Sequence, residues 1–156
     1  MTLPVVLLAL AGTAAQAPSG EGSAPAIESV LSGARACATG KLTQERMAER
    51  LAVADWKPGA IHQPRPTMTM KAYHRGEVTL YYFTSKPMTQ CIVRAATGKH
   101  FPVDKLMAGL SLEFGKSPKV DAPGRRYLYP LPRLDILTLQ IKSDAEEPHV
   151  ELRVVH

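Results

Sequence analysis

The spacing of apolar residues along the chain changes from a helical period to a strand period. Six apolar residues near the N-terminus recur every three or four positions, at Ile27, Val30, Leu31, Ala34, Cys37 and Ala38. Gly40 is suited to end this helix, and Thr43 can cap a second one with Met47, Leu51 and Ala54 on its apolar side. Residues 58–66 contain three prolines and predict a loop.

Beyond residue 66, apolar and polar residues alternate, which is typical of strands. Three such runs, residues 67–73, 77–84 and 89–96, are joined by short connections, and this predicts an antiparallel meander. In the middle run Val78, Leu80 and Tyr82 share one face, and Thr79, Tyr81 and Phe83 share the other.

A further helical pattern covers about residues 102–114, and Gly115 closes it. Residues 115–133 hold four prolines and predict a loop, and two strands, 134–142 and 149–155, follow. The order predicts an α+β fold with two N-terminal helices, a three-stranded antiparallel meander, one helix and two C-terminal strands. The strands should form a single, roughly five-stranded antiparallel sheet with the helices packed on it.

The first residues have the pattern of an export signal. Residues 3–10 are apolar except for Pro4, and Ala15-Gln16-Ala17 supplies the small residues that a signal peptidase reads. We therefore expect a signal peptide over residues 1–17, a flexible tether over 18–26 and a single α+β domain over 27–156. The protein should then be periplasmic or secreted, with no transmembrane anchor after cleavage. The alternative is an ordinary N-terminal helix.

The two cysteines predict a disulfide. Cys37 lies on the apolar stripe of the first helix, and Cys91 lies on the predicted core face of the third strand. An oxidising compartment pairs an even number of cysteines. The alternatives are two separate buried thiols, or a catalytic cysteine with a nearby histidine.

The remaining residues show no catalytic or metal-binding motif. The five histidines have no ligand spacing; they are His62, His74, His100, His149 and His156. No nucleophile elbow, phosphate-binding loop, dinucleotide fingerprint or zinc-protease motif occurs. We predict no catalytic residue, no metal and no cofactor.

Two surfaces are candidates for binding. The first is the outer face of the meander, where aromatic residues lie beside cations: Lys71, Tyr73, Tyr81, Phe83, Ile92 and Arg94. The second is the loop after the third helix, whose cations are Lys116, Lys119, Arg125, Arg126 and Arg133 against Asp121 alone. The structural alternatives are a sheet face covered by the chain itself and a solvated loop.

Charge and composition limit the choice of function. The formal net charge is +5, from 19 Lys and Arg against 14 Asp and Glu; this moderate charge fits solubility as well as an anionic envelope component or another protein as partner. Export argues against nucleic acid. The leading hypothesis is a non-catalytic interaction module of the cell envelope. A small-ligand-binding domain is the alternative, and an unrecognised hydrolase is the third hypothesis.

Overall fold

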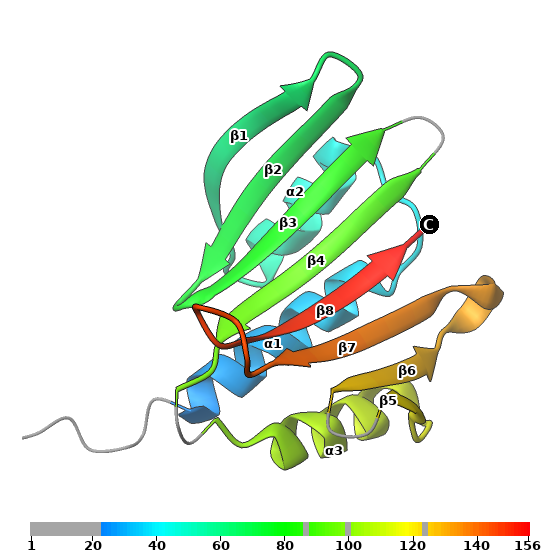
Figure 1. Cartoon of the computed structure of the whole chain (residues 1–156). Helices are drawn as coiled ribbons and strands as arrows, with labels where there is room; N and C mark the ends of the chain where they lie inside the picture. The colour runs from blue at the N-terminus through cyan, green and yellow to red at the C-terminus, as the bar shows by residue number, and fades with distance from the viewer. Residues whose placement is uncertain (1–22, 86–87, 99–100, 123–124) are drawn as a thin grey trace, which may run out of the picture.

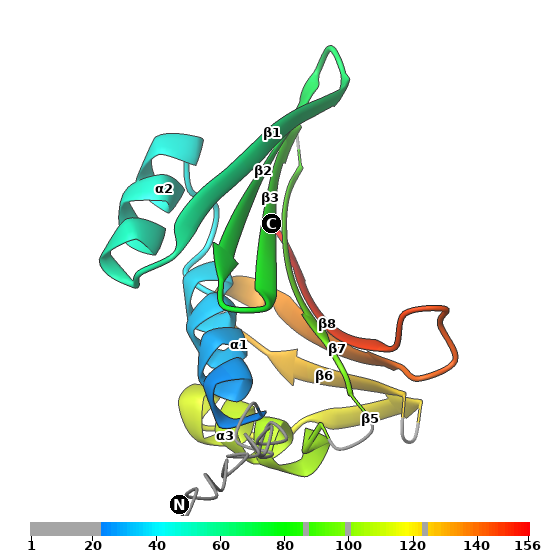
Figure 2. The same cartoon turned by 90° about the vertical axis from the view of Figure 1, so that its left-hand side faces the viewer.

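A computed structural model describes residues 23–85, 88–98, 101–122 and 125–156, and it shows an α+β fold. One eight-stranded antiparallel sheet has three helices on one side (Figure 1). The sheet curves so that its other side is concave, and no helix of the described chain covers it (Figure 2). We call this helix-free side the open face.

The helices are α1 (Ser23–Cys37), α2 (Gln44–Val53) and α3 (Val103–Phe114). The strands are β1 (Lys57–Arg65), β2 (Met68–Arg75), β3 (Val78–Ser85), β4 (Thr89–Ala96), β5 (Lys119–Ala122), β6 (Arg126–Pro130), β7 (Ile136–Lys142) and β8 (His149–Val155). A short 3-10 helix, Pro132–Leu134, joins β6 to β7. The predicted signal peptide, residues 1–17, lies outside the described residues, and α1 begins at Ser23, inside the segment predicted as a tether.

The strand order is β1-β2-β3-β4-β8-β7-β6-β5, which makes the sheet from two similar halves. Each half is a four-stranded meander that follows a helix, with α2 inserted in the first half, and the halves join where β4 pairs with β8. The two leading helices also share a sequence pattern, IESVLSG at 27–33 and VDKLMAG at 103–109. The chain therefore repeats one helix-and-meander unit, which the strand and helix periods alone did not reveal.

The prediction of a five-stranded sheet is wrong, because three strands lie in segments predicted as loops. Strand β1 holds two prolines and pairs with β2 through two register shifts. It lies at the sheet edge, where proline is tolerated because the outer N–H groups need no partner. Strands β5 and β6 pair with a similar irregularity, and β5 is the other edge.

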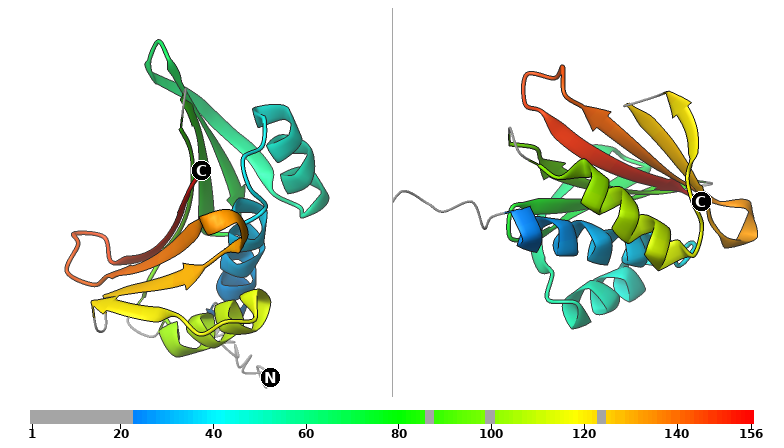
Figure 3. Two further views of the ribbon diagram at one scale, coloured as in Figure 1. Left: turned by 90° about the vertical axis from the view of Figure 1, so that its right-hand side faces the viewer. Right: turned by 90° about the horizontal axis from the view of Figure 1, so that it is seen from below.

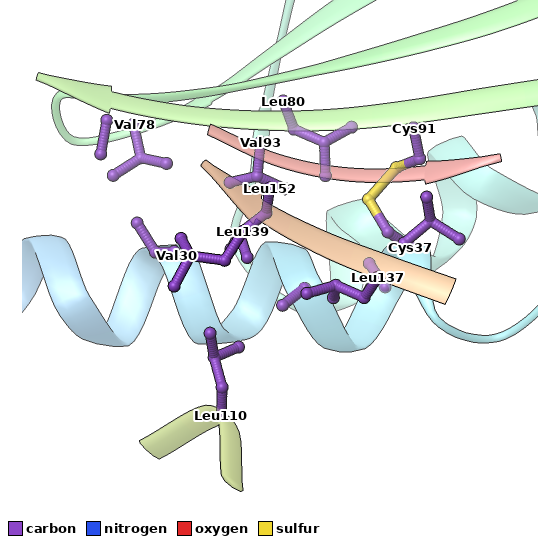
Figure 4. Packing of buried hydrophobic residues seen from close by; sticks show 14 of the residues in the cluster. Val30, Cys37, Val78, Leu80, Cys91, Val93, Leu110, Leu137, Leu139 and Leu152 are labelled. Carbon is purple, nitrogen blue, oxygen red and sulfur yellow. A yellow bond between two sulfur atoms is a disulfide. The ribbon is translucent and has the colours of Figure 1, made fainter. Parts of the chain in front are cut away.

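The core lies between the sheet and the helices. Leu80, Val93, Leu152 and Leu139 pair side by side across four neighbouring strands and point toward α1, each at most 1% exposed (Figure 4). Gly33 allows α1 to approach closely, because a Cβ atom there would lie 2.8 Å from Val93 Cγ2. Alternate residues of the same strands must therefore point to the open face.

The predicted disulfide between Cys37 and Cys91 is confirmed. The two Cα atoms are 5.6 Å apart, and the bond fastens the end of α1 to β4 (Figure 4). Both sulfur atoms are used, so the two alternatives, separate thiols and a catalytic cysteine, are wrong.

Candidate functional site

The centre of the open face holds a buried carboxylate surrounded by cations. Glu151 of β8 is 1% exposed, although it points away from the helices. Its Oε2 accepts a hydrogen bond from Arg94 of β4 at 2.9 Å, and its Oε1 accepts one from Arg153 at 2.8 Å. Lys142 of β7 donates to Oε2 at 3.4 Å. We call Glu151, Arg94, Arg153 and Lys142 the Glu151 cluster.

Strand alternation and register build this cluster. In β8, Val150, Leu152 and Val154 face the helices, so Glu151 and Arg153 face the opposite way. The register places Arg94 directly beside Glu151 on one side and Gln140 beside it on the other. The ion pair between β4 and β8 thus lies where the two halves of the sheet meet.

The cluster carries a net positive charge. Burial alone raises the pKa of Glu151, but hydrogen bonds from Arg94 and Arg153 and the charges of Lys142 and Arg153 outweigh it and lower this pKa below its usual range. Glu151 is therefore ionised at neutral pH. Three cations against one carboxylate leave two positive charges in excess, and the arginine side chains remain 46% and 44% exposed.

His149 extends the cluster. Its Nδ1 donates to the backbone carbonyl of Glu147 at 2.7 Å, because a carbonyl oxygen can only accept. Its Nε2 is buried, has no hydrogen-bond partner and lies 4.0 Å from Glu151 Oε2.

A cavity of about 470 Å³ opens beside the Glu151 cluster, under the turn between β7 and β8. This turn projects on the open side of the sheet (Figure 3). The cavity is lined by Arg94, Tyr81 and His149 and also by the carboxylate residues Glu77, Glu146 and Glu147. It therefore has groups of both charges along its wall.

The sheet-face residues from the sequence prediction divide between the two sides. Tyr81, Phe83, Ile92 and Arg94 lie on the open face, and Arg94 lies over the Tyr81 ring, 6.0 Å from its centroid. Tyr73 pairs with the core residue Leu80, and Lys71 pairs with the buried Tyr82, so both face the helices.

The aromatic residues continue into a row of apolar side chains. Met70 pairs with Phe83, Phe83 with Gln90, and Gln90 with Val155. Ile136 continues this line, because the adjacent Leu137 pairs with Val154. We call Met70, Phe83, Val155 and Ile136 the apolar row.

The predicted cationic loop is a hairpin and a turn, and two of its charges have local partners. Arg126 of β6 is bonded to Asp121 of β5, and Arg125 lies 3.0 Å from Asp144 in the β7–β8 turn. Asp121, the single carboxylate of this segment, therefore pairs with Arg126, and Arg125 has a carboxylate partner in the neighbouring turn. Of the remaining cations, Lys116 follows α3, Lys119 lies in β5, and Arg133 lies in the 3-10 helix.

Sequence reasoning missed Glu151, Arg153 and Lys142 as site residues. Alternation in residues 149–155 was a usable signal, since it places Glu151 and Arg153 together on the side opposite the core. The burial of Glu151 was not visible, because Arg94 lies 57 residues away in the sequence.

A second cavity, of about 620 Å³, lies elsewhere and has different chemistry. Its lining, as far as the structure describes it, holds several threonines and a single charged residue, Lys41. Thr43, one of these threonines, already caps α2 by accepting a hydrogen bond from the Arg46 N–H at 3.3 Å. This lining brings no acid together with a base, so it supports no catalytic pair.

Other classes of site find no support in the described residues. They contain no group of three or more His, Cys, Asp or Glu side chains that could hold a metal ion. None of the described helices has the length and apolar character needed to cross a bilayer. Comparisons with protein-family models, curated proteins and solved structures found no match for this chain.

Proposed function

We propose that this protein is an exported, non-catalytic binding module that binds an anionic partner through the open face. The Glu151 cluster is the observation that carries the proposal. Its two excess positive charges lie at the centre of a concave surface that no described helix covers. An anion placed there would relieve the mutual repulsion of the three cations.

Export is the second part of the proposal. The signal-like residues 1–17 favour it, and the disulfide is compatible with an oxidising periplasmic or extracellular location. We expect the intact mass of the native protein to match a chain that begins at Pro18. A native chain that keeps residues 1–17 in the cytoplasm would contradict export without affecting the binding proposal.

Neutralising the two arginines should weaken binding to a polyanion. The Arg94→Gln/Arg153→Gln variant removes two positive charges but keeps side chains that can donate hydrogen bonds to Glu151. Each exposed charge contact contributes up to about 1 kcal/mol, so affinity for immobilised dextran sulfate should fall about 10-fold at low salt. Biolayer interferometry measures the affinity, and circular dichroism verifies the fold.

The matched control is Arg46→Gln/Arg50→Gln, which removes the same charge from α2. Both of these arginines are exposed and lie on the opposite side of the sheet. The control should bind almost as well as the wild type. Equal weakening of the two double variants would show that net charge alone drives binding, and the open-face proposal would then be wrong.

A small-ligand-binding function is a second candidate, favoured by His149. A buried imidazole nitrogen without a partner is costly, and Nε2 belongs to a residue that lines the 470 Å³ cavity. A ligand group that donates a hydrogen bond to Nε2 would satisfy it. Titration with small-molecule fragments that shifts the His149 ring resonances would support this function. Resonances that stay unchanged with every fragment would contradict it.

A further inference from the structure

The open face has two kinds of surface side by side. The Glu151 cluster lies around the row in which Arg94, Glu151, Gln140 and Arg126 pair across four strands. The apolar row crosses the same sheet four residues away along β8, and the polar Gln90 of β4 lies within its line between Phe83 and Val155. With a rise of about 3.3 Å per residue, the two rows are about 13 Å apart. Tyr81 and Ile92 lie between them.

The apolar row is unusual because half of it is accessible. Ile136 is 48% exposed and Val155 is 42% exposed, although both belong to central strands. Phe83 and Met70 are partly buried. A partner that covers these side chains would gain hydrophobic stabilisation that charge contacts alone do not supply.

The Glu151 cluster and the apolar row together limit the class of partner that fits the open face. A polyanion without apolar groups would leave the apolar row in water. A second copy of this chain, docked by its open face, would bring two clusters of excess positive charge together. A planar bilayer does not fit a concave face (Figure 2). An acidic protein segment with apolar side chains matches both surfaces.

We infer that the open face binds an acidic protein segment whose carboxylates lie on Arg94, Arg153 and Lys142 and whose apolar side chains lie on the apolar row. This inference rests on the proposed function and specifies its partner. Arg94 and Arg153 can take part because each contacts Glu151 through one terminal nitrogen. Their side chains are 46% and 44% exposed, so a carboxylate can reach their remaining guanidinium N–H groups.

The test compares two polypeptide probes of equal length, poly-L-glutamate and a random copolymer of Glu and Tyr. The full mature protein should bind the copolymer at least 10-fold more tightly, and this advantage should persist at higher salt because hydrophobic contacts are not screened. Ile136→Thr/Val155→Thr keeps strand-forming residues but should remove most of the advantage. Isothermal titration measures both affinities.

The control variant is Val53→Gln/Leu112→Gln, which removes two apolar residues that are 91% and 86% exposed on α2 and α3. It should keep the copolymer advantage. Equal affinity of the wild type for the two probes would overturn the inference while leaving the anionic-partner proposal intact. Failure to bind dextran sulfate and both probes would overturn the two together.

Two further outcomes would identify a different occupant and overturn the inference. One is binding to anionic phospholipid vesicles that is tighter than binding to the copolymer. The other is a dimer, seen by sedimentation, that the Ile136→Thr/Val155→Thr variant disrupts.

Discussion

Removing the disulfide, with Cys37→Ser and Cys91→Ser together, should lower the free energy of unfolding by about 4 kcal/mol. The bond closes a loop with a sequence separation of 54 residues, and cross-linking a loop of this size removes much chain entropy from the unfolded state. The bond also holds α1 against β4, where Val93 and Gly33 pack closely. Urea denaturation followed by circular dichroism measures the difference.

Reducing agent supplies the internal control for this prediction. The wild type in reductant should approach the stability of the double serine variant, and the variant itself should not respond to reductant. A loss below about 1 kcal/mol would mean that packing of α1 alone holds this part of the fold. Binding to polyanions should change little, since the open face lies on the other side of the sheet.

Replacing Arg94 and Arg153 with Ala should destabilise the fold by about 2 kcal/mol at pH 7. Alanine offers no donor, so the Glu151 carboxylate would lose the hydrogen bonds from both arginines and keep Lys142 as its remaining cation in the cluster. Removing the partners of a fully buried charge costs about 3 to 5 kcal/mol. We expect less because both arginines are nearly half exposed, which screens the ion pairs.

The stability deficit of the double alanine variant should depend on pH, and the pKa of Glu151 sets the direction of that dependence. In the wild type the pKa of Glu151 is lowered, so its contribution to stability is present above the usual carboxyl pKa of about 4.3 and is lost as pH falls through the lower folded value. In the double alanine variant the hydrogen bonds from Arg94 and Arg153 that lower this pKa are lost, so the pKa should rise relative to that of the wild type. The stability deficit should therefore be full at pH 7 and shrink toward pH 4.

Adding Glu151→Gln to the double alanine variant completes a mutant cycle. The substitution removes the charge that has lost two of its three cations, so most of the deficit at pH 7 should disappear. A deficit that is the same at pH 7 and pH 4, and that Glu151→Gln leaves unchanged, would show that lost arginine packing and not the buried charge is responsible.

Sequence periodicity predicted the elements with strong local patterns. Helix α2 begins where Thr43 caps it, and α3 ends at Gly115, whose φ of 63° is the left-handed conformation that favours glycine. The alternation in residues 77–84 correctly separated Leu80 and Tyr82 from Tyr81 and Phe83.

The three missed strands have weak local signals. Residues 57–65 and 119–130 contain prolines, and these strands depend on a neighbouring strand to complete their pairing. Tyr127 and Tyr129 alternate in β6 and were the available clue, outweighed by the prolines around them. Strands of this kind, two of them at the sheet edges, are defined by tertiary pairing more than by their own residues.

The candidate site was only partly predictable for the same reason. Arg94 and Tyr81 were correctly placed on one face because they belong to a single hairpin, in which local alternation is enough. The Glu151 cluster needs the pairing of β4 with β8, which depends on how the two halves of the sheet meet. Lys71 and Tyr73 were assigned to the same face as Tyr81, but the β2–β3 register turns them toward the helices.

Amide chemical-shift mapping would locate the surface of the protein that binds an acidic partner. The uniformly ¹⁵N-labelled mature protein would be titrated with the Glu and Tyr copolymer at low salt. We expect the largest shifts in β4, β7 and β8, around Arg94, Lys142, Glu151 and Arg153, with a smaller set at Phe83 and Val155. Largest shifts on α2 or on the β5–β6 hairpin, with the central strands unchanged, would contradict binding by the open face.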